Sequence, residues 1–328
     1  MATNTITGTQ TLFELGKRIE GGKAMVIAKN LARNNELLSL LPFREANNSG
    51  FHKHLRQLVL PTGSWRGVGE GVAKALGQTV PVDEPLCRHE LQNEIDEAAF
   101  DMIADAVSMR RDEDLMALEG VGQGIAYGLI YGPGSKGLLN GLFTRYFDPA
   151  AQPANVIDNY PTGSGAGYTS ALIMEMGETG VYGIYPKGSK TFGINAEDMG
   201  RVRVSDPVTA TKWYFAWITR IYANLGLCIR DERAVQRVGS IKTGAAKAAG
   251  GLDDDNILRA INKLPALGQS AATRIFVNRE VKTQMDILAK AQTNINYSFG
   301  DFGGHPVTLF RGIAVSFQES ISANENAI

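Results

Sequence analysis

The sequence predicts an α+β fold, and three stretches carry that prediction. Between residues 94 and 131, apolar side chains recur at steps of three and four, which is the spacing of one face of a helix. Between 212 and 230 they alternate with polar side chains, as in one long strand. From about 252 to 292, a capped helix, the buried strand RIFVN and a second capped helix follow one another.

The bulk composition is that of an ordinary globular protein. The 328 residues are 44% hydrophobic and carry a formal net charge of -1, so no global basic field indicates nucleic-acid binding. Cys87 and Cys228 lie far apart in sequence, which argues against a zinc ribbon, a redox motif or a disulfide framework. The N-terminal stretch has no apolar core of a signal peptide, and we expect synthesis in the cytosol with no membrane partner.

The first 90 residues predict two unusual segments. Residues 1 to 45 begin with a small, polar run and continue into two helical patterns that end before Pro42. The strand-like runs HKHLRQLVL (52 to 60) and QTVPVDEPL (78 to 86) then flank a long connection rich in Gly and Pro. Such a hairpin has too few apolar residues to pack on its own domain, so its stability would come from elsewhere, such as a neighbouring subunit.

The remaining elements follow in order. We expect one long helix from about Glu94 to Tyr131, with Asp112 to Asp114 complementing a helix N-terminus. Glycines at 120, 122, 124 and 128 are expected to allow the close approach of another backbone. The turn GETG predicts a hairpin between the strands SALIMEM and VYGIYP. Asp253 and Asn278 are expected N-caps, and HPVTLFRGIAVSF reads as a final hairpin.

The chemical signals do not assemble into a catalytic, cofactor or metal site. The one Gly-Lys dipeptide lacks the Ser or Thr of a phosphate-binding loop, and GVGQGIAYG lies inside a helical pattern. His52 and His54 share a strand face but lack a third ligand nearby, so a solvated strand edge is favoured. The acids Asp253 to Asp255 are explained by helix capping. We therefore predict a building block rather than an enzyme.

Four longer motifs resemble those of a known family. They are LPTGSWRGVGEGV (60 to 72), EDLMALEGVGQGIAYGLIYG (113 to 132), VYGIYPKGSKTFGINAEDMG (181 to 200) and LGLCIRDERAVQRV (225 to 238). In these motifs, and in their order, the chain resembles the major capsid proteins of tailed bacteriophages, which share the Hong Kong 97-like fold. Within that family it is similar to the short-tailed-phage branch with the epsilon-fifteen and Bordetella phage shells.

The resemblance implies a division of the chain into functional parts. Residues 1 to 45 would be the N-terminal arm, 46 to 93 the extended loop, and 94 to 164 the peripheral domain with its spine helix. Residues 165 to 300 would form the axial α/β domain, with strands shared with the peripheral domain, and 301 to 328 the C-terminal return strands. Leu60, Trp65, Arg66 and Glu70 would then lie in an assembly interface, because the family's extended loop lies across a neighbouring subunit.

The resemblance also implies partners. Subunits would form the pentamers and hexamers of an icosahedral shell, assembled in the host bacterial cytoplasm and enclosing double-stranded DNA bound without sequence specificity. Separate scaffolding, portal and cement or decoration proteins are expected, with no cofactor. Five basic residues could face the DNA: Lys17, Arg18, Lys23, Lys29 and Arg33. A solvated helix face explains these five equally well. The alternative functions are a soluble α/β enzyme with a Gly-rich loop site and a phage decoration or tail protein.

Overall fold

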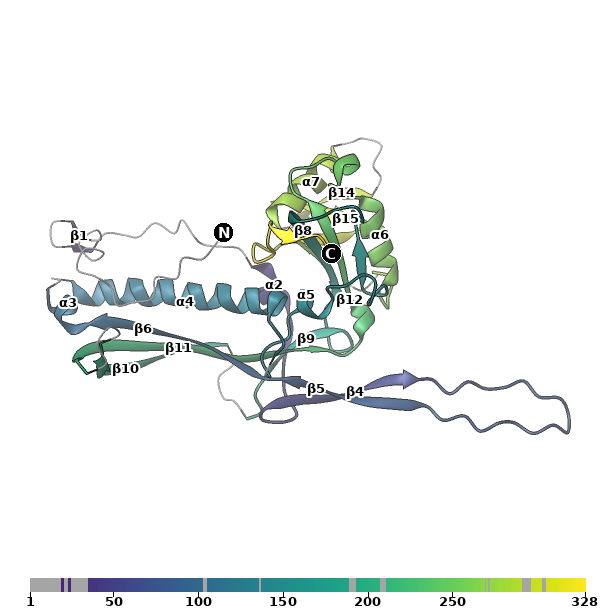
Figure 1. Cartoon of the computed structure of the whole chain (residues 1–328), viewed down its shortest axis with the longest axis horizontal. Helices are drawn as coiled ribbons and strands as arrows, with labels where there is room; N and C mark the ends of the chain where they lie inside the picture. Colours follow the sequence, from purple (N-terminus) through teal and green to yellow (C-terminus); the bar gives the residue numbers. More distant parts are fainter. Residues whose placement is uncertain are drawn as a thin grey trace. The chain divides into compact units, whose positions relative to one another are not determined.

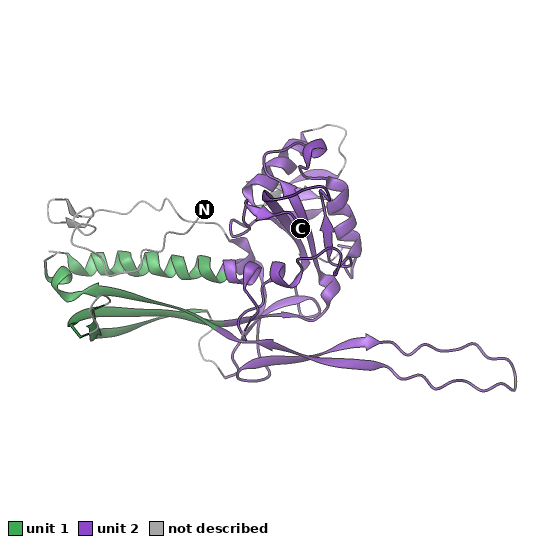
Figure 2. Cartoon of the chain, viewed as in Figure 1, with its two compact units in different colours: residues 1–33, 88–125, 191–224 green, residues 34–87, 126–190, 225–328 purple. Residues whose placement is uncertain are grey.

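The protein divides into two compact units. The computed structural model describes residues 19–20, 23–24, 35–102, 105–135, 137–188, 193–206, 211–268, 270, 272–290, 296–302 and 305–328. Unit 1 comprises residues 1–33, 88–125 and 191–224, and unit 2 comprises 34–87, 126–190 and 225–328 (Figure 2). Among the described residues, no helix combines the length and the apolar character needed to cross a membrane.

Unit 1 is built on the first part of a 17-residue strand, β11 (Trp213–Ile229). Strand β10 (Ile194–Ser205) pairs antiparallel with it, and β6 (Cys87–Asp96) pairs with it too. The short helix α3 (Glu97–Asp101) and residues 106–125 of the 26-residue helix α4 (Ala106–Tyr131) also belong to the unit, together with the two-residue strands β1 (Ile19–Glu20) and β2 (Lys23–Ala24). Figure 1 shows α4 running along the strands. The long alternating strand is thus confirmed.

The helix predicted from residue 94 begins later than expected. Residues up to Asp96 belong to strand β6, because pairing with β11 outweighs the helical spacing of their apolar side chains. Asp96 caps α3 by accepting a hydrogen bond from Ala98 N at 2.9 Å. Because α4 starts at Ala106, the acids from Asp112 to Asp114 lie inside the helix and not at its N-terminus. The expected close approach of another backbone is wrong: at Gly124 a Cβ would come 2.5 Å from Nε2 of the His89 side chain, and at Gly120 it would meet nothing within 4 Å.

Unit 2 is built on an eight-stranded sheet. Its strands run in the order β14 (Tyr297–Phe302), β15 (His305–Phe310), β16 (Ile313–Phe317), β13 (Thr273–Val277), β8 (Ala166–Glu175), β12 (Val235–Lys242), β7 (Val156–Asp158), with β17 (Glu325–Asn326) also paired to β8. Helices α6 (Asp254–Lys263) and α7 (Arg279–Ala289) bury Ile257, Ile261 and Met285 in one core cluster with Ile173 and Ile275 of the sheet. This is the α/β section expected from the sequence.

Four short elements and a second group of strands also belong to unit 2. The elements are the helix α2 (Glu36–Leu40), the helix α5 (Leu142–Arg145), and the 3-10 turns η1 (Glu232–Ala234) and η2 (Lys247–Ala249). Strand β9 (Val181–Tyr185) pairs antiparallel with residues 226–229 of β11 and parallel with β3 (Phe43–Glu45).

The hairpin predicted at GETG is wrong. Strands β8 and β9 lie in different sheets, and Met176, just after β8, forms an isolated parallel bridge with Val181 of β9. Strand β8 already has β12 on one edge and β13 on the other, so no edge remains for β9. The residue types of a turn indicate that the chain changes direction there. Which strands pair depends on the other strands of the sheet.

Both predicted helix caps and the final hairpin are confirmed. Asp253 accepts a hydrogen bond from Asp255 N at 3.0 Å, and Asn278 accepts one from Val281 N at 3.0 Å. Each side chain therefore satisfies one of the free N–H groups at its helix start. Strands β15 and β16 pair antiparallel through Leu309 and Phe310, on either side of Arg311 and Gly312.

The C-terminal strand is held to unit 2 by a buried charge network. The guanidinium of Arg237 donates to Glu325 Oε2 at 2.9 Å, and both side chains are less than a tenth exposed. Arg237 also donates to the carbonyl of Tyr146 at 2.9 Å, and Ser170 donates to Glu325. Tyr131 donates to the same carboxylate, and burial together with Glu325 raises the pKa of this phenol. The network joins α4, β8, β12 and the chain end.

We predict that Glu325→Ala lowers the free energy of unfolding by about 3–5 kcal/mol, because it leaves the buried Arg237 guanidinium without its carboxylate. Glu319→Ala is the matched control. Glu319 pairs at 3.5 Å with Arg279, whose side chain is 74% exposed, so its loss should cost less than about 1 kcal/mol. Urea unfolding of the two variants measures both costs, and equal losses would contradict the prediction.

Candidate assembly interface

The most unusual part of unit 2 is a two-stranded arm. Strands β4 (Phe51–Val59) and β5 (Gln78–Pro85) pair antiparallel from Phe51 opposite Pro85 to Val59 opposite Gln78. Figure 1 shows the chain continuing beyond both strands as a long loop. We call residues 51–85 the extended hairpin and residues 60–77 its distal segment. All residues from 57 to 81 are exposed, so the outer part of the hairpin lacks a core of its own.

The base of the extended hairpin is fixed by a buried ion pair. Glu84 of β5 is 3% exposed, and both of its carboxylate oxygens accept hydrogen bonds from Arg145 of α5, at 2.7 and 2.5 Å. Arg56 of β4 lies 3.8 Å from the same carboxylate and donates to the carbonyl of Ile229 at 2.7 Å. A bidentate pair sets direction as well as distance. The pair therefore ties the base of the hairpin to α5.

The two histidines of β4 face into unit 2 and not toward solvent, so the predicted solvated strand edge is wrong. His54 is 9% exposed, with Nδ1 3.7 Å from Cys228 Sγ, and His52 Nε2 lies 3.1 Å from the hydroxyl of Tyr182. Burial lowers the pKa of both histidines, and Arg56 lowers that of His54 further. Burial raises the pKa of Cys228 to about 11, so its thiol stays protonated at neutral pH.

This histidine and cysteine cluster does not suit a metal ion. Three arginines, Arg44, Arg56 and Arg230, repel positive charge on one or both histidines. A protonated thiol is also a poor ligand, because metals bind the thiolate. The cluster therefore acts as packing that holds β4 against β9 and β11.

The distal segment carries large apolar side chains that are strongly exposed. Trp65 is 104% exposed, Val68 109% and Leu76 87%. Of the four residues expected at an assembly interface, Leu60 and Trp65 are exposed apolar groups of this kind. The other two stabilise a turn: Arg66 donates to the carbonyl of Glu70 at 3.0 Å, and the Glu70 carboxylate accepts from Gly67 N at 2.9 Å.

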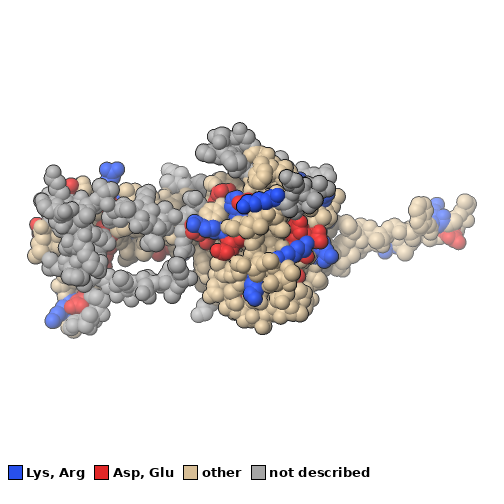
Figure 3. All heavy atoms as spheres, turned by 90° about the horizontal axis from the view of Figure 1, so that it is seen from above, with Lys and Arg blue, Asp and Glu red and all other residues tan. Residues whose placement is uncertain are grey.

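The structure does not test the five basic residues predicted to face DNA. Lys17, Arg18, Lys29 and Arg33 lie outside the described residues, and for Lys23 only its place in β2 is described. On the face drawn in Figure 3, basic and acidic residues are interspersed. That distribution agrees with the net charge of -1 and provides no broad basic field on this face.

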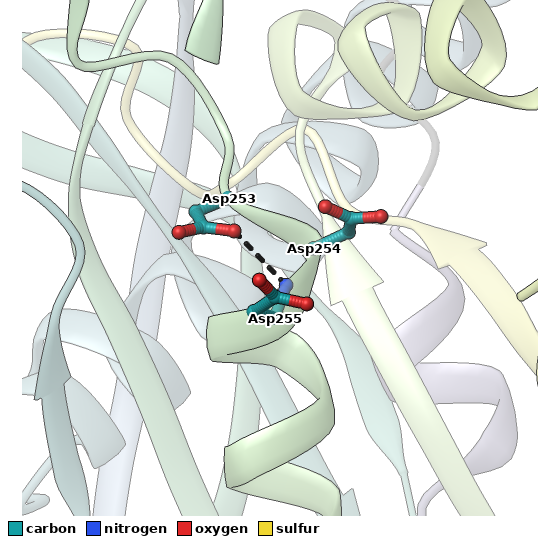
Figure 4. Close-up of side chains that lie close together, drawn as sticks. All are labelled: Asp253, Asp254 and Asp255. Atoms are coloured by element: carbon teal, nitrogen blue, oxygen red, sulfur yellow. Dashed lines mark hydrogen bonds between the residues drawn. The ribbon is translucent and has the colours of Figure 1, made fainter. Parts of the chain in front are cut away.

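The acidic run at the start of α6 is occupied by a side chain. Ligand atoms of Asp253, Asp254 and Asp255 lie within 4.8 Å of one another (Figure 4). The ammonium of Lys247 lies 2.7 Å from Asp253, 3.0 Å from Asp254 and 3.8 Å from Asp255. Asp253 and Asp254 raise the pKa of Lys247. A lysine thus supplies the positive charge that a metal would bring, which supports the capping interpretation.

Sequence reasoning missed the residues that hold the hairpin. Glu84 and Arg145 are 61 positions apart, and Arg56 and Glu232 are 176 apart. No local spacing connects residues so distant, so only the folded chain identifies this anchor. The available signal was a run of charged residues, Asp83 and Glu84, inside a strand pattern.

One comparison with known proteins identifies a family, and another identifies a shared fold. The family model described as major capsid protein GP7 matches residues 20–328. Among solved structures, the chain is similar to bacteriophage Epsilon15, with a TM-score of 0.72, 20% identity, and coverage of 100% of this chain and 99% of that chain. This similarity shows a shared fold. No curated protein sequence matches the chain at the significance required of a relative.

Two further structures are similar over much of their length. The bacteriophage JBD30 capsid has a TM-score of 0.43 and 10% identity, with coverage of 97% of this chain and 96% of that one. The holo-SrpI encapsulin of Synechococcus elongatus PCC 7942 also has a TM-score of 0.43 and 10% identity, with coverage of 70% and 95%.

We predict that acid destabilises unit 2 through the base of the hairpin. The folded protein keeps His52 and His54 neutral because burial lowers each pKa below the ordinary value of 6.5, whereas the unfolded chain takes up protons near 6.5. Their contribution is therefore complete above pH 6.5 and is lost as the pH falls below it. The double variant with His52→Gln and His54→Gln should lose less stability between pH 7.5 and 5, as measured by urea unfolding. Parallel curves for variant and wild type would contradict this.

Proposed function

The chain belongs to the GP7 family of major capsid proteins, and we propose that its extended hairpin joins neighbouring subunits in the shell. Membership of this family places the protein in the virion capsid, as a structural component that forms a shell with other copies. The observation that carries the proposal is the distal segment, whose apolar side chains are uncovered while its base is tied down by Glu84 and Arg145.

The energetics favour burial of the distal segment on another copy. Soluble proteins seldom expose a run of large apolar side chains without a partner surface. Transfer of one such side chain from water contributes roughly 1.5–3 kcal/mol. A hairpin fixed only at its base can reach a second subunit without loss of structure in its own. Repeated around a shell, many moderate contacts of this kind produce cooperative assembly.

The parts of the chain take their roles from this arrangement. We propose the N-terminal arm at 1–45, the extended loop at 46–93, the peripheral domain at 94–164, the axial domain at 165–300 and the return strands at 301–328. Subunits form pentamers and hexamers of an icosahedral shell around double-stranded DNA, assembled in the bacterial cytoplasm. Scaffolding, portal and cement proteins are separate chains. The role is structural and involves no catalysis.

Electron microscopy after size-exclusion chromatography tests this function. The full chain is expressed alone and with its neighbouring phage genes. Closed or aberrant shells, or discrete pentamers and hexamers, are the expected result. A stable monomer or dimer under both conditions would overturn the proposal.

We predict that Trp65→Ala prevents assembly without unfolding the subunit. The indole is 104% exposed, so its removal should change the free energy of unfolding by less than about 0.5 kcal/mol. A buried Trp at an interface contributes about 2 kcal/mol or more per contact, so particle yield should fall strongly. The matched control is Ile287→Ala on α7, where the side chain is 58% exposed. If the Trp65→Ala variant formed normal particles, Trp65 would not be part of the interface.

We also predict that the five basic residues of the arm contribute to DNA retention. Replacing Lys17, Arg18, Lys23, Lys29 and Arg33 by Gln removes the positive charge that would attract phosphates. DNA content per particle, measured by absorbance after nuclease treatment, should fall while shell yield is kept. Unchanged DNA content would assign these residues to a solvated face.

A further inference from the structure

The hairpin of β10 and β11 in unit 1 carries a ladder of alternating arginine and aromatic side chains. Trp213, Phe215 and Trp217 share one face of β11, because they stand two positions apart. On β10, Arg201 lies opposite Trp217, and Arg203 lies opposite Phe215. Each guanidinium lies over the aromatic ring next to the one it is paired with, on the side of the hairpin turn. Arg201 is 4.3 Å from the ring centroid of Phe215, and Arg203 is 4.4 Å from that of Trp213. We call these five residues the cation–π ladder.

The ladder is covered at one end and open at the other. Trp217 contacts the ring of Phe100 at 5.6 Å and lies beneath Arg110 at 5.4 Å, so α3 and α4 shield it. Phe215 is 45% exposed and Trp213 54% exposed. Arg203 is exposed and makes no ion pair within the described part of the chain, and the same is true of the neighbouring Lys212. Two large rings and two cations without an ion pair among the described residues are therefore exposed at this end.

This composition fits a protein partner better than DNA. Trp and Arg are enriched at the centres of protein interfaces, where a stacked guanidinium is already ordered before binding. A DNA-binding surface needs a net positive field. Here the same hairpin also carries acids, so the local charge is nearly balanced: Glu197, Asp198 and Asp206 accompany Arg201, Arg203, Lys212 and Arg220.

A complementary surface lies at the same end of unit 1. Around the end of α3 and the start of α4, Asp101 and Asp105 are exposed, with Met102 66% exposed and Val107 76% exposed. We call these four residues the acidic α3 surface. It adjoins the ladder, because Phe100 packs on Trp217 and Glu97 accepts a hydrogen bond from Arg201 at 2.7 Å. One end of the unit thus presents a basic aromatic face beside an acidic apolar one.

We propose that the open end of the cation–π ladder binds the acidic α3 surface of a second copy of this chain. The two surfaces differ, so the contact is head-to-tail, and such contacts can close into a ring. Both surfaces lie at one end of the unit. Each copy can therefore contact one neighbour through its ladder and another through its acidic α3 surface, around a common axis. The inference rests on the shell role of the family and is independent of the extended hairpin.

A charge exchange in the full-length protein tests the proposal. Arg203→Glu and Asp101→Arg should each lower particle yield by about tenfold or more, since each places like charges face to face. The double variant restores the opposite charges and should recover most of the yield. Lys212→Glu is a second charge reversal, at a basic residue outside the ladder. It replaces Arg203→Glu in the test if thermal unfolding shows that the Arg203→Glu variant does not fold. Arg279→Glu, at a 74% exposed side chain on α7, is the control and should assemble normally.

The outcomes separate this contact from the hairpin. Recovery by charge exchange supports the proposed pair, whereas Trp65→Ala should not be rescued by either change. Normal yield from both single variants, or no recovery in the double variant, would overturn the proposal. Normal yield of shells with a loss of DNA in Arg203→Glu would also overturn it, because the ladder would then be a phosphate-binding surface.

Discussion

The bidentate ion pair between Glu84 and Arg145 fixes the base of the extended hairpin in unit 2. A carboxylate that is 3% exposed is stable only if its charge is met in full, and Arg145 meets both oxygens. Arg56, from the other strand of the hairpin, adds a second positive charge and ties β4 to the end of β11. Both strands are thereby held at the base of the extended hairpin, and the distal segment continues from that base.

That constraint explains how an arm without a core can remain useful. The distal segment has no strand pairing and no buried residues, so it contributes little to the stability of the subunit. Its apolar side chains gain stabilisation only when a second surface covers them. The sheets of such a subunit are packed within the subunit, whereas the apolar side chains of its arm are exposed. This agrees with membership of a family of major capsid proteins.

Three further clusters show the same use of charge for structure. Arg237 and Glu325 secure the chain end, Lys247 neutralises the acids at the start of α6, and the cation–π ladder orders two arginines on rings. Each resembles a functional site when only residue types are considered. Their partners within the chain explain the first two as structural, and the open end of the ladder is what sets the third apart.

The sequence by itself determined the elements whose signals are local. The alternation from 213 to 229, the caps Asp253 and Asn278, and the exposed character of residues 60 to 77 follow from spacing, capping chemistry and composition. Only the tertiary structure decided which strands pair, where α4 begins, and that His54 faces Cys228. Those choices depend on residues far apart in the chain. Strand β8 has no free edge for β9, and β6 forms a strand because it pairs with β11. Glu84 forms its ion pair with Arg145, 61 positions later in the sequence. Local spacing carries no information about such partners, because their energy exists only once the chain has folded.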